Sequence, residues 1–215
     1  MAIPDPCPIA GASRRGRRAA VIWFALALGG CSINLGSLSP GSESETPKPA
    51  PAGTAASDAQ AHATRGQALS RSGKAEEALS EFEQAIALDP NNTQALYGRG
   101  LLHQHEKQHQ LAIEDFTAAN GLTPQRAEPL LGRAISYLAL DQAREAAADL
   151  DEAVQADPQN VQIWVTRGLT YERLGDRAKA ADSYGRAINL RPKDESAQSG
   201  FARVGGKPGQ TADTF

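Results

Sequence analysis

The stretch Thr93–Arg126, TQALYGRGLLHQHEKQHQLAIEDFTAANGLTPQR, decides the fold because its pattern occurs four times without an insertion. The four units have 34 residues each and run Ala59–Asn92, Thr93–Arg126, Ala127–Asn160 and Val161–Asp194. Small residues recur at positions 8, 20 and 27 of the unit, a bulky residue at position 24 and proline at position 32. The residues are, at position 8, Gly66, Gly100, Ala134 and Gly168; at position 20, Ala78, Ala112, Ala146 and Ala180; at position 27, Ala85, Ala119, Ala153 and Ala187; at position 24, Phe82, Phe116, Leu150 and Tyr184; and at position 32, Pro90, Pro124, Pro158 and Pro192.

Each unit is predicted to fold as two helices joined by a turn. Small side chains let two helices approach closely, and the bulky residue at position 24 fills the space beside them. The proline ends the second helix, and Gly73 and Gly175 mark the turn between the two helices of their units. Aromatic residues make up only 5% of the chain, which favours closely packed helices over a strand-rich core.

A period of 34 residues with these small, bulky and proline positions resembles the tetratricopeptide repeat (TPR). The resemblance covers Ala59–Asp194 and implies an all-α fold, a right-handed TPR solenoid of four helix-turn-helix repeats at residues 59–92, 93–126, 127–160 and 161–194. Residues 195–204 continue the register, with Phe201 among them, and we expect a C-terminal capping helix that covers the last repeat. Residues 205–215 are predicted to be a flexible tail.

The first thirty residues have the composition of an export signal. Four arginines between positions 14 and 18 precede the apolar run Ala19–Leu28, which is too short to be a membrane span. The run ends in Leu28-Gly29-Gly30-Cys31, which resembles the bacterial lipobox and implies that Cys31 carries lipid after cleavage. Residues 1–30 are therefore predicted to be a lipoprotein signal peptide; the alternative is an ordinary secretory signal with a cysteine at its cleavage site.

The segment after the predicted signal peptide has the composition of a tether. Residues 31–58 are predicted to be the lipidated Cys31 and a disordered linker, because Ser, Pro, Gly, Thr and Ala dominate the stretch. Such a composition cannot bury enough apolar surface to form a core.

The second unit also contains H-E-x-x-H, the signature of zinc proteases, at residues 105–109. That motif requires both histidines on one face of one helix. The repeat register instead places His105 at position 13 and His109 at position 17, on either side of the central turn, and no later histidine could be a third ligand. A zinc hydrolase that uses His105 and His109 stays as the alternative from another class, while we predict no metal site, no cofactor and no catalytic residue.

The charged residues are arranged for internal pairing rather than for nucleic acid. The net charge is −3, the pI is about 5.8 and the basic residues are scattered, so no nucleic-acid partner is expected. Arginine occupies position 7 of every unit, and position 23 is acidic in the first three. The predicted pairs are Arg65–Glu81, Arg99–Asp115 and Arg133–Asp149, whereas Arg167 faces Ser183, with Asp182 adjacent.

The TPR resemblance implies that the first helices line a concave groove, which positions 2, 5, 9, 12 and 13 face. Chaperone-binding TPR domains hold a terminal carboxylate with Lys, Asn and Arg at positions 5 and 9, and the four units have none of these there. An apolar groove suits an amphipathic helix or an apolar peptide; the alternative is that it packs against itself, the tail or a second copy in a homodimer. The predicted partner-binding residues are Tyr97, Leu101, Leu131, Ile135, Leu138, Val165 and Leu169.

A lipid anchor joined to TPR units resembles the NlpI-type lipoproteins, adaptors that present peptidoglycan hydrolases to a periplasmic protease. The resemblance implies a non-catalytic scaffold that binds other proteins and is held by lipid on Cys31 to a bacterial membrane, facing the periplasm. Ser32 does not look like an inner-membrane retention signal, so the outer membrane is expected. The alternative is an assembly factor for a pilus or secretion apparatus, and the fold does not choose between the two.

Overall fold

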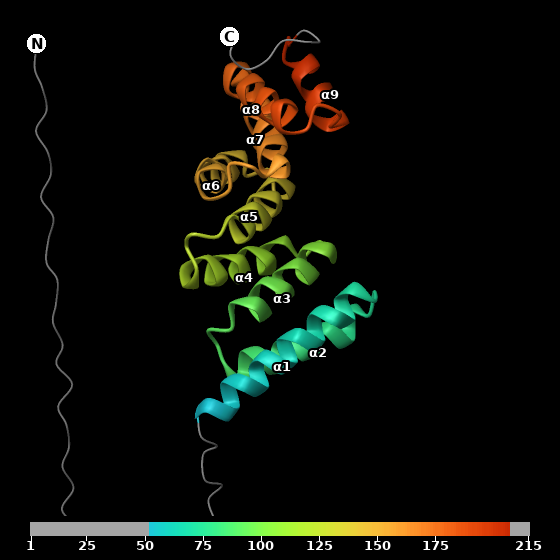
Figure 1. Cartoon of the computed structure of the whole chain (residues 1–215), viewed down its shortest axis with the longest axis vertical. Helices are drawn as coiled ribbons and strands as arrows, with labels where there is room; N and C mark the ends of the chain where they lie inside the picture. Colours follow the sequence, from blue (N-terminus) through green and yellow to red (C-terminus); the bar gives the residue numbers. More distant parts are fainter. Residues whose placement is uncertain (1–51, 207–215) are drawn as a thin grey trace, which may run out of the picture. The chain divides into compact units, whose positions relative to one another are not determined.

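The computed structural model describes residues 52–206, and this part of the chain consists of nine helices with no strand, which confirms the predicted all-α fold. Figure 1 shows the helices following one another in chain order as pairs. Their bounds are α1 Ala52–Arg71, α2 Ala75–Leu88, α3 Thr93–His105, α4 His109–Leu122, α5 Ala127–Ala139, α6 Ala143–Ala156, α7 Val161–Arg173, α8 Arg177–Leu190 and α9 Glu195–Arg203. The predicted signal peptide, the lipidation site Cys31 and residues 31–51 of the predicted linker lie outside the described residues.

The four repeats are the helix pairs α1–α2, α3–α4, α5–α6 and α7–α8, and the two helices of each pair pack against each other. Each second helix also contacts the first helix of the following pair, and α8 contacts α9 in the same way. Successive first helices contact one another, from α1 with α3 to α7 with α9, whereas within residues 52–206 no two second helices do. The first helices therefore form the inner layer of the stack.

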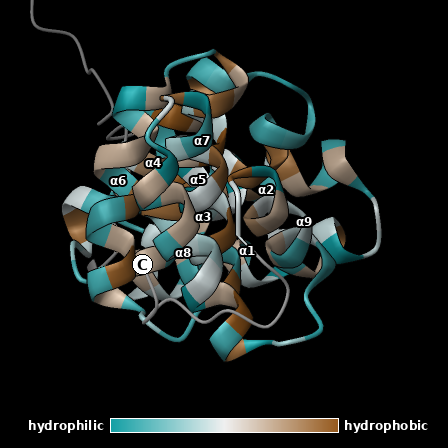
Figure 2. Cartoon of the chain, turned by 90° about the horizontal axis from the view of Figure 1, so that it is seen from above, coloured by the Kyte–Doolittle hydropathy of each residue, from teal (hydrophilic) through white to brown (hydrophobic). Residues whose placement is uncertain are grey.

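The core lies between the two layers. In Figure 2 hydrophobic and hydrophilic stretches alternate along the helix ribbons. The residues at position 24 are among the largest fully buried side chains: Phe82, Phe116, Leu150 and Tyr184. Alanines at positions 20 and 27 of all four repeats are completely buried beside them. The predicted roles of the small and bulky positions are thereby confirmed.

Each aromatic ring at position 24 lies between two glycines on first helices. Phe82 meets Gly66 of its own repeat, where an ideal Cβ would stand 2.7 Å from the ring, and Gly98 of the next repeat, where a Cβ would stand even closer. Phe116 lies in the same way between Gly100 and Gly132, and Tyr184 between Gly168 and Gly200. The sequence reading identified the glycines at position 8 but missed those at position 6.

The turn inside every repeat is closed by the same backbone motif. In the first repeat the amide of Gly73 donates to the carbonyl of Ser70 and that of Lys74 to the carbonyl of Leu69, the bonding pattern of a Schellman motif. The middle residue of the three-residue turn has a positive φ in all four repeats: 78° at Gly73, 63° at Lys107, 60° at Asp141 and 79° at Gly175. The turn thus keeps its shape even where glycine is replaced.

Two predicted boundaries differ from the structure. Helix α1 begins at Ala52 rather than at Ala59, so residues 52–58 of the predicted linker are helical. The physical reason is the alanine content of this stretch, since alanine has the highest helix propensity. At the other end, Gly205 and Gly206 of the predicted tail close α9, because their amides donate to the carbonyls of Ala202 and Phe201. The remainder of the tail, residues 207–215, lies outside the described residues.

The predicted capping helix is α9. Its buried residues are Ala197, Gly200 and Phe201, and Phe201 packs in one cluster with Tyr171 and Tyr184. Among the helices that the structure describes, none is both long and apolar enough to cross a membrane.

Candidate partner-binding groove

The inner layer carries a row of at least partly exposed apolar side chains across the middle of the repeat array, which we call the groove floor. It consists of the side chains at positions 5 and 9 of α3, α5 and α7. Leu101 is 40% exposed, and the other members are partly exposed. Because positions 5 and 9 lie one helical turn apart, each first helix contributes two neighbouring side chains to the floor. The members are Tyr97, Leu101, Leu131, Ile135, Val165 and Leu169.

Leu138 was predicted to belong to this surface, but it is only 7% exposed. It packs in a core cluster with Leu130, Leu150 and Ile163. Position 12 lies at the flank of the helix, where the following repeat can cover it. Leu138 therefore contributes to stability and offers little surface to a partner.

Polar side chains next to the floor hold neighbouring repeats together. The amide of Gln104 donates to the carbonyl of Gly132 and to the hydroxyl of Ser136, both at 2.9 Å. The guanidinium of Arg173 donates to the carbonyl of Leu138 at 2.8 Å. These bonds cross from the second repeat to the third and from the fourth back to the third, so they fix the register of the floor.

A cavity of about 270 Å³ opens at the end of the floor near the first repeat. It is lined by Gln67, Thr93, Gln94, Tyr97, Arg126, Glu128 and Pro129. Burial raises the pKa of the Tyr97 hydroxyl, and the nearby carboxylate of Glu128 raises it further. The Tyr97 hydroxyl is thus available as a hydrogen-bond donor at this cavity.

A second cavity, of about 470 Å³, opens where α9 meets the floor. Its lining combines Val165 and Leu169 of the floor with Tyr184 and with polar residues of α9, Glu195, Ser196, Ser199 and Arg203. The sequence reading treated α9 only as a cap and missed these residues. The signal was present, because the continued register puts Ser199 at position 5 and Arg203 at position 9, two of the groove positions.

A charged cluster includes two residues that line this second cavity, Tyr184 and Arg203. The guanidinium of Arg203 donates two hydrogen bonds to the carboxylate of Glu172, at 2.8 and 2.9 Å, and the hydroxyl of Tyr184 donates to the same carboxylate at 2.8 Å. The hydrogen bond from Arg203 lowers the pKa of Glu172. Burial, followed by the bond to Glu172, raises the pKa of Tyr184. The cluster ties α9 to the inner layer.

The two histidines of the H-E-x-x-H sequence lie on different helices, as the register predicted. His105 ends α3 and is exposed, whereas His109 begins α4. Residues 52–206 contain no group of three potential metal ligands. The other two histidines make protein contacts: His62 bonds to Glu81 at 2.7 Å and His103 to Gln108 at 2.7 Å.

The predicted arginine–acid pairs form within the first three repeats. Arg99 and Arg133 each donate two hydrogen bonds to the acid at position 23, with shortest distances of 2.6 Å to Asp115 and 2.7 Å to Asp149. Arg65 approaches Glu81 at 3.6 Å. Hydrogen bonding to the acid raises the pKa of both Arg99 and Arg133.

Arg167 in the fourth repeat has different partners. It donates to Ser183 at 2.7 Å and approaches Asp182 at 3.7 Å, but its ion pair at 2.7 Å is with Asp151 of the preceding repeat. The hydroxyl of Tyr171 donates to the same carboxylate at 2.6 Å. This pair therefore links two repeats, which the alignment of repeats did not predict.

The comparison with protein families agrees with the geometry, because a sequence model of the tetratricopeptide repeat matches residues 64–127 and 131–195. The chain belongs to the tetratricopeptide repeat family. TPR proteins are generally non-catalytic scaffolds that bind other proteins. No curated protein sequence matches this TPR chain significantly.

Solved TPR structures share its fold. The MamA protein superimposes with a TM-score of 0.64 and 20% identity over 68% of this chain and 80% of MamA. PilF of Pseudomonas aeruginosa gives a TM-score of 0.64 and 20% identity over 70% of this chain and 69% of PilF. The first TPR domain of Spaghetti (RPAP3), bound to the HSP90 peptide SRMEEVD, gives a TM-score of 0.52 and 21% identity over 54% of this chain and 92% of that domain. Identities this low show the fold alone.

Proposed function

We propose that this chain is a non-catalytic scaffold that binds a segment of another protein on the groove floor. The observation that carries the proposal is the row of apolar side chains across three repeats, of which Leu101 is 40% exposed and the others, through to Val165 and Leu169, are partly exposed. An apolar patch of this kind on a folded repeat array usually serves as an interaction site. The RPAP3 domain provides a precedent within the fold, since it binds a peptide.

The proposal extends to location and role. An N-terminal segment with the pattern of a lipoprotein signal supports export and lipid attachment at Cys31, with the TPR domain facing the periplasm from the outer membrane. Lipid and TPR repeats together support an NlpI-like adaptor that brings cell-wall hydrolases to a protease. A Cys31→Ser variant should lose labelled palmitate and leave the membrane fraction; retention of both would contradict the anchor.

Capture of partners from the cell envelope tests the scaffold. The full chain, tagged at its C-terminus, is crosslinked in its own cells, and the captured proteins are identified by mass spectrometry. The groove variant Leu101→Asp/Leu131→Asp should lose the specific partners. The control is Leu88→Asp/Leu122→Asp, which alters leucines of the second helices whose exposure, 42% and 40%, matches that of Leu101. Circular dichroism of both variants must show native helix content, because Leu131 is partly buried against the core.

The identity of the captured proteins tests the adaptor role. Hydrolases or a protease that are lost only in the groove variant would support the NlpI-like role. Pilus or secretion components with the same dependence would replace it by an assembly role. Capture of this chain alone would identify the floor as a self-association surface and overturn the scaffold proposal.

A further inference from the structure

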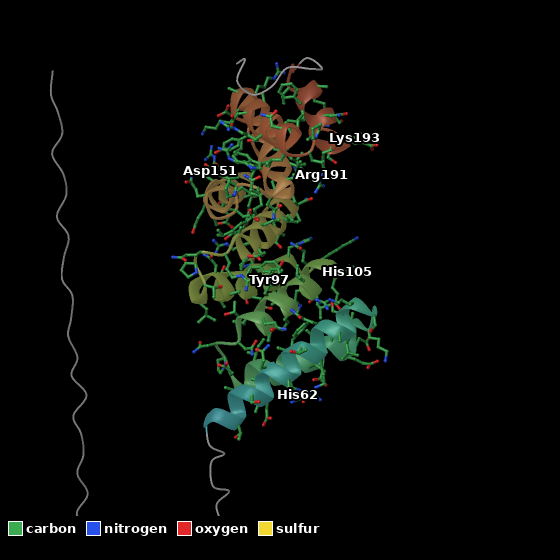
Figure 3. All side chains as sticks on the ribbon, in the orientation of Figure 1. His62, Tyr97, His105, Asp151, Arg191 and Lys193 are labelled. Atoms are coloured by element: carbon green, nitrogen blue, oxygen red, sulfur yellow. The ribbon has the colours of Figure 1, made fainter. Side chains whose placement is uncertain are left out.

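The two margins of the groove carry different charges. The first helices cross the groove, so position 2 lies at one margin and position 13 at the other, roughly 16 Å apart at 1.5 Å per residue. The position-2 margin consists mainly of amides, Gln60, Gln94 and Gln162, together with Glu128. The position-13 margin carries Arg71, His105 and Arg173, which are all exposed. Figure 3 shows His105 at one end of α3 and Tyr97 toward its other end.

The arginines of the position-13 margin have no acidic partner. Neither Arg71 nor Arg173 takes part in an ion pair of the described residues, although Arg173 donates one hydrogen bond to a backbone carbonyl. The two carboxylates at groove positions of the four repeats are matched, Glu128 by Arg126 at 3.0 Å and Glu172 by Arg203 at 2.8 Å. Glu195 has no ion pair, but it lies beside the position-2 margin, at the start of α9.

Exposed arginines without ion pairs also occur on the second helices, at Arg144 and Arg177, so Arg71 and Arg173 are distinguished by their place at the groove margin. The net charge is −3, and the arginines at position 7 of the same helices are matched with acids. Unmatched arginines at a groove margin are available to a partner, and charge complementarity favours a partner with carboxylates on the side that faces them.

We infer that the groove binds an amphipathic helix of another protein that carries Asp and Glu on one flank only. The inference rests on the proposed scaffold function. The apolar face of the helix covers Leu101, Leu131, Ile135, Val165 and Leu169, while its acidic flank faces Arg71 and Arg173. Its other flank faces the glutamines and is uncharged and polar.

A helix fits the dimensions better than an extended strand. A helix with its side chains is about 10–12 Å wide, which suits a groove of roughly 16 Å between its margins. The floor contributes two apolar side chains from each first helix, and a helix presents a stripe of comparable width at i, i+3, i+4 and i+7. An extended peptide would cover one row and leave the other in water.

A display selection on the full chain tests the inference. The probe is a library of 18-residue helices with a fixed leucine stripe and with Glu, Lys, Gln and Ser randomised on both flanks. After selection, Glu should exceed Lys by about tenfold on one flank, the effect expected of two exposed ion pairs, with no excess on the other. The peptide SRMEEVD, which is acidic but has no leucine stripe, should bind more weakly than the selected helices.

Charge variants assign the effect to the position-13 margin. Arg71→Gln/Arg173→Gln should abolish the excess of Glu while the leucine stripe still binds. Because Arg173 also donates to the carbonyl of Leu138, the single change Arg71→Gln, which removes no such bond, should lower the excess on its own. The control Arg144→Gln/Arg177→Gln, which changes two exposed arginines without ion pairs on second helices, should leave the excess intact. Equal Glu and Lys on both flanks, an excess of Lys, tighter binding of SRMEEVD, or no selected helix at all would each overturn the inference. The scaffold function is tested separately, by the loss of captured partners in Leu101→Asp/Leu131→Asp. A failed selection for acidic helices would therefore overturn this inference without overturning the scaffold function.

Discussion

The ring of Phe82 in α2 occupies the space that a Cβ atom on Gly98 of α3 would need, although the two residues belong to different repeats. The same ring covers Gly66 of its own repeat. One aromatic side chain therefore sets the separation between the two helices of its repeat and also the distance to the next repeat. In the third repeat Leu150 takes the place of the ring, and the two glycine positions hold Ala134 and Thr166.

Gly98→Ala should lower the free energy of unfolding by about 1–3 kcal/mol, because the added methyl overfills a packed site. The loss should occur although alanine has the higher helix propensity. Urea unfolding followed by circular dichroism measures it. Gly121→Ala is the matched control: nothing lies within 4 Å of a Cβ there, so the same change should stabilise α4 by about 0.5–1 kcal/mol.

Phe82→Leu should reduce the effect of Gly98→Ala, since the third repeat combines a leucine at position 24 with larger residues at the glycine positions. The double mutant should be more stable than the sum of the two single changes predicts. Strict additivity would contradict the view that Phe82 and Gly98 determine each other's size.

The repeat register allowed most of the fold to be predicted, because it fixes which residues are equivalent. It gave the helix pairs, the place of Phe201 in the cap and the separation of His105 from His109. It also contained the pairing of glycine with aromatic residues, which was missed because position 6 varies between glycine and threonine. Position 6 is glycine where the preceding repeat has an aromatic residue at position 24, and it is Thr166 where the preceding repeat has Leu150.

Other features depend on neighbours that a single repeat does not contain. Leu138 holds a groove position in the alignment, yet it is buried in a core cluster that includes Ile163 of the next repeat. Arg167 makes its shorter ion pair with Asp151 of the preceding repeat, since position 23 of its own repeat is Ser183 and Asp182 stays 3.7 Å away. The positive φ of Lys107, in contrast, could have been predicted from the sequence, since Lys107 stands in register with Gly73 and Gly175.

Lys107→Gly should stabilise the protein by about 1 kcal/mol, because a φ of 63° is unfavourable for a residue with a side chain. Asp141→Gly should stabilise less, since aspartate tolerates left-handed backbone better than lysine does. The reverse change, Gly73→Ala, should destabilise through the backbone alone, because nothing lies within 4 Å of the new Cβ. Thermal unfolding of the three variants ranks them, and a destabilised Lys107→Gly would contradict the argument.

The pair Arg99–Asp115 should couple more strongly than Arg167–Asp151. The side chain of Asp115 is only 6% exposed and receives two hydrogen bonds from Arg99, whereas that of Asp151 is 45% exposed. Double-mutant cycles with Arg→Gln and Asp→Asn should give a coupling of about 1–3 kcal/mol for the first pair and below about 1 kcal/mol for the second. Zero coupling between Arg99 and Asp115 would show that the pair does not support the repeat.

Asn120→Val should stabilise the protein by about 1–2 kcal/mol. The side-chain oxygen Oδ1 of Asn120 is buried without a hydrogen-bond partner, and such a group destabilises the folded state by about 1–3 kcal/mol. The equivalent position 28 holds Ile86, Val154 and Ile188 in the other repeats, and Val154 and Ile188 pack in core clusters. The reverse change, Ile86→Asn, should introduce the same defect in the first repeat and destabilise by about 2–4 kcal/mol. Urea unfolding of both variants measures the difference, and a less stable Asn120→Val would mean that the carbonyl of Asn120 bonds to a buried water, which the apolar variant displaces.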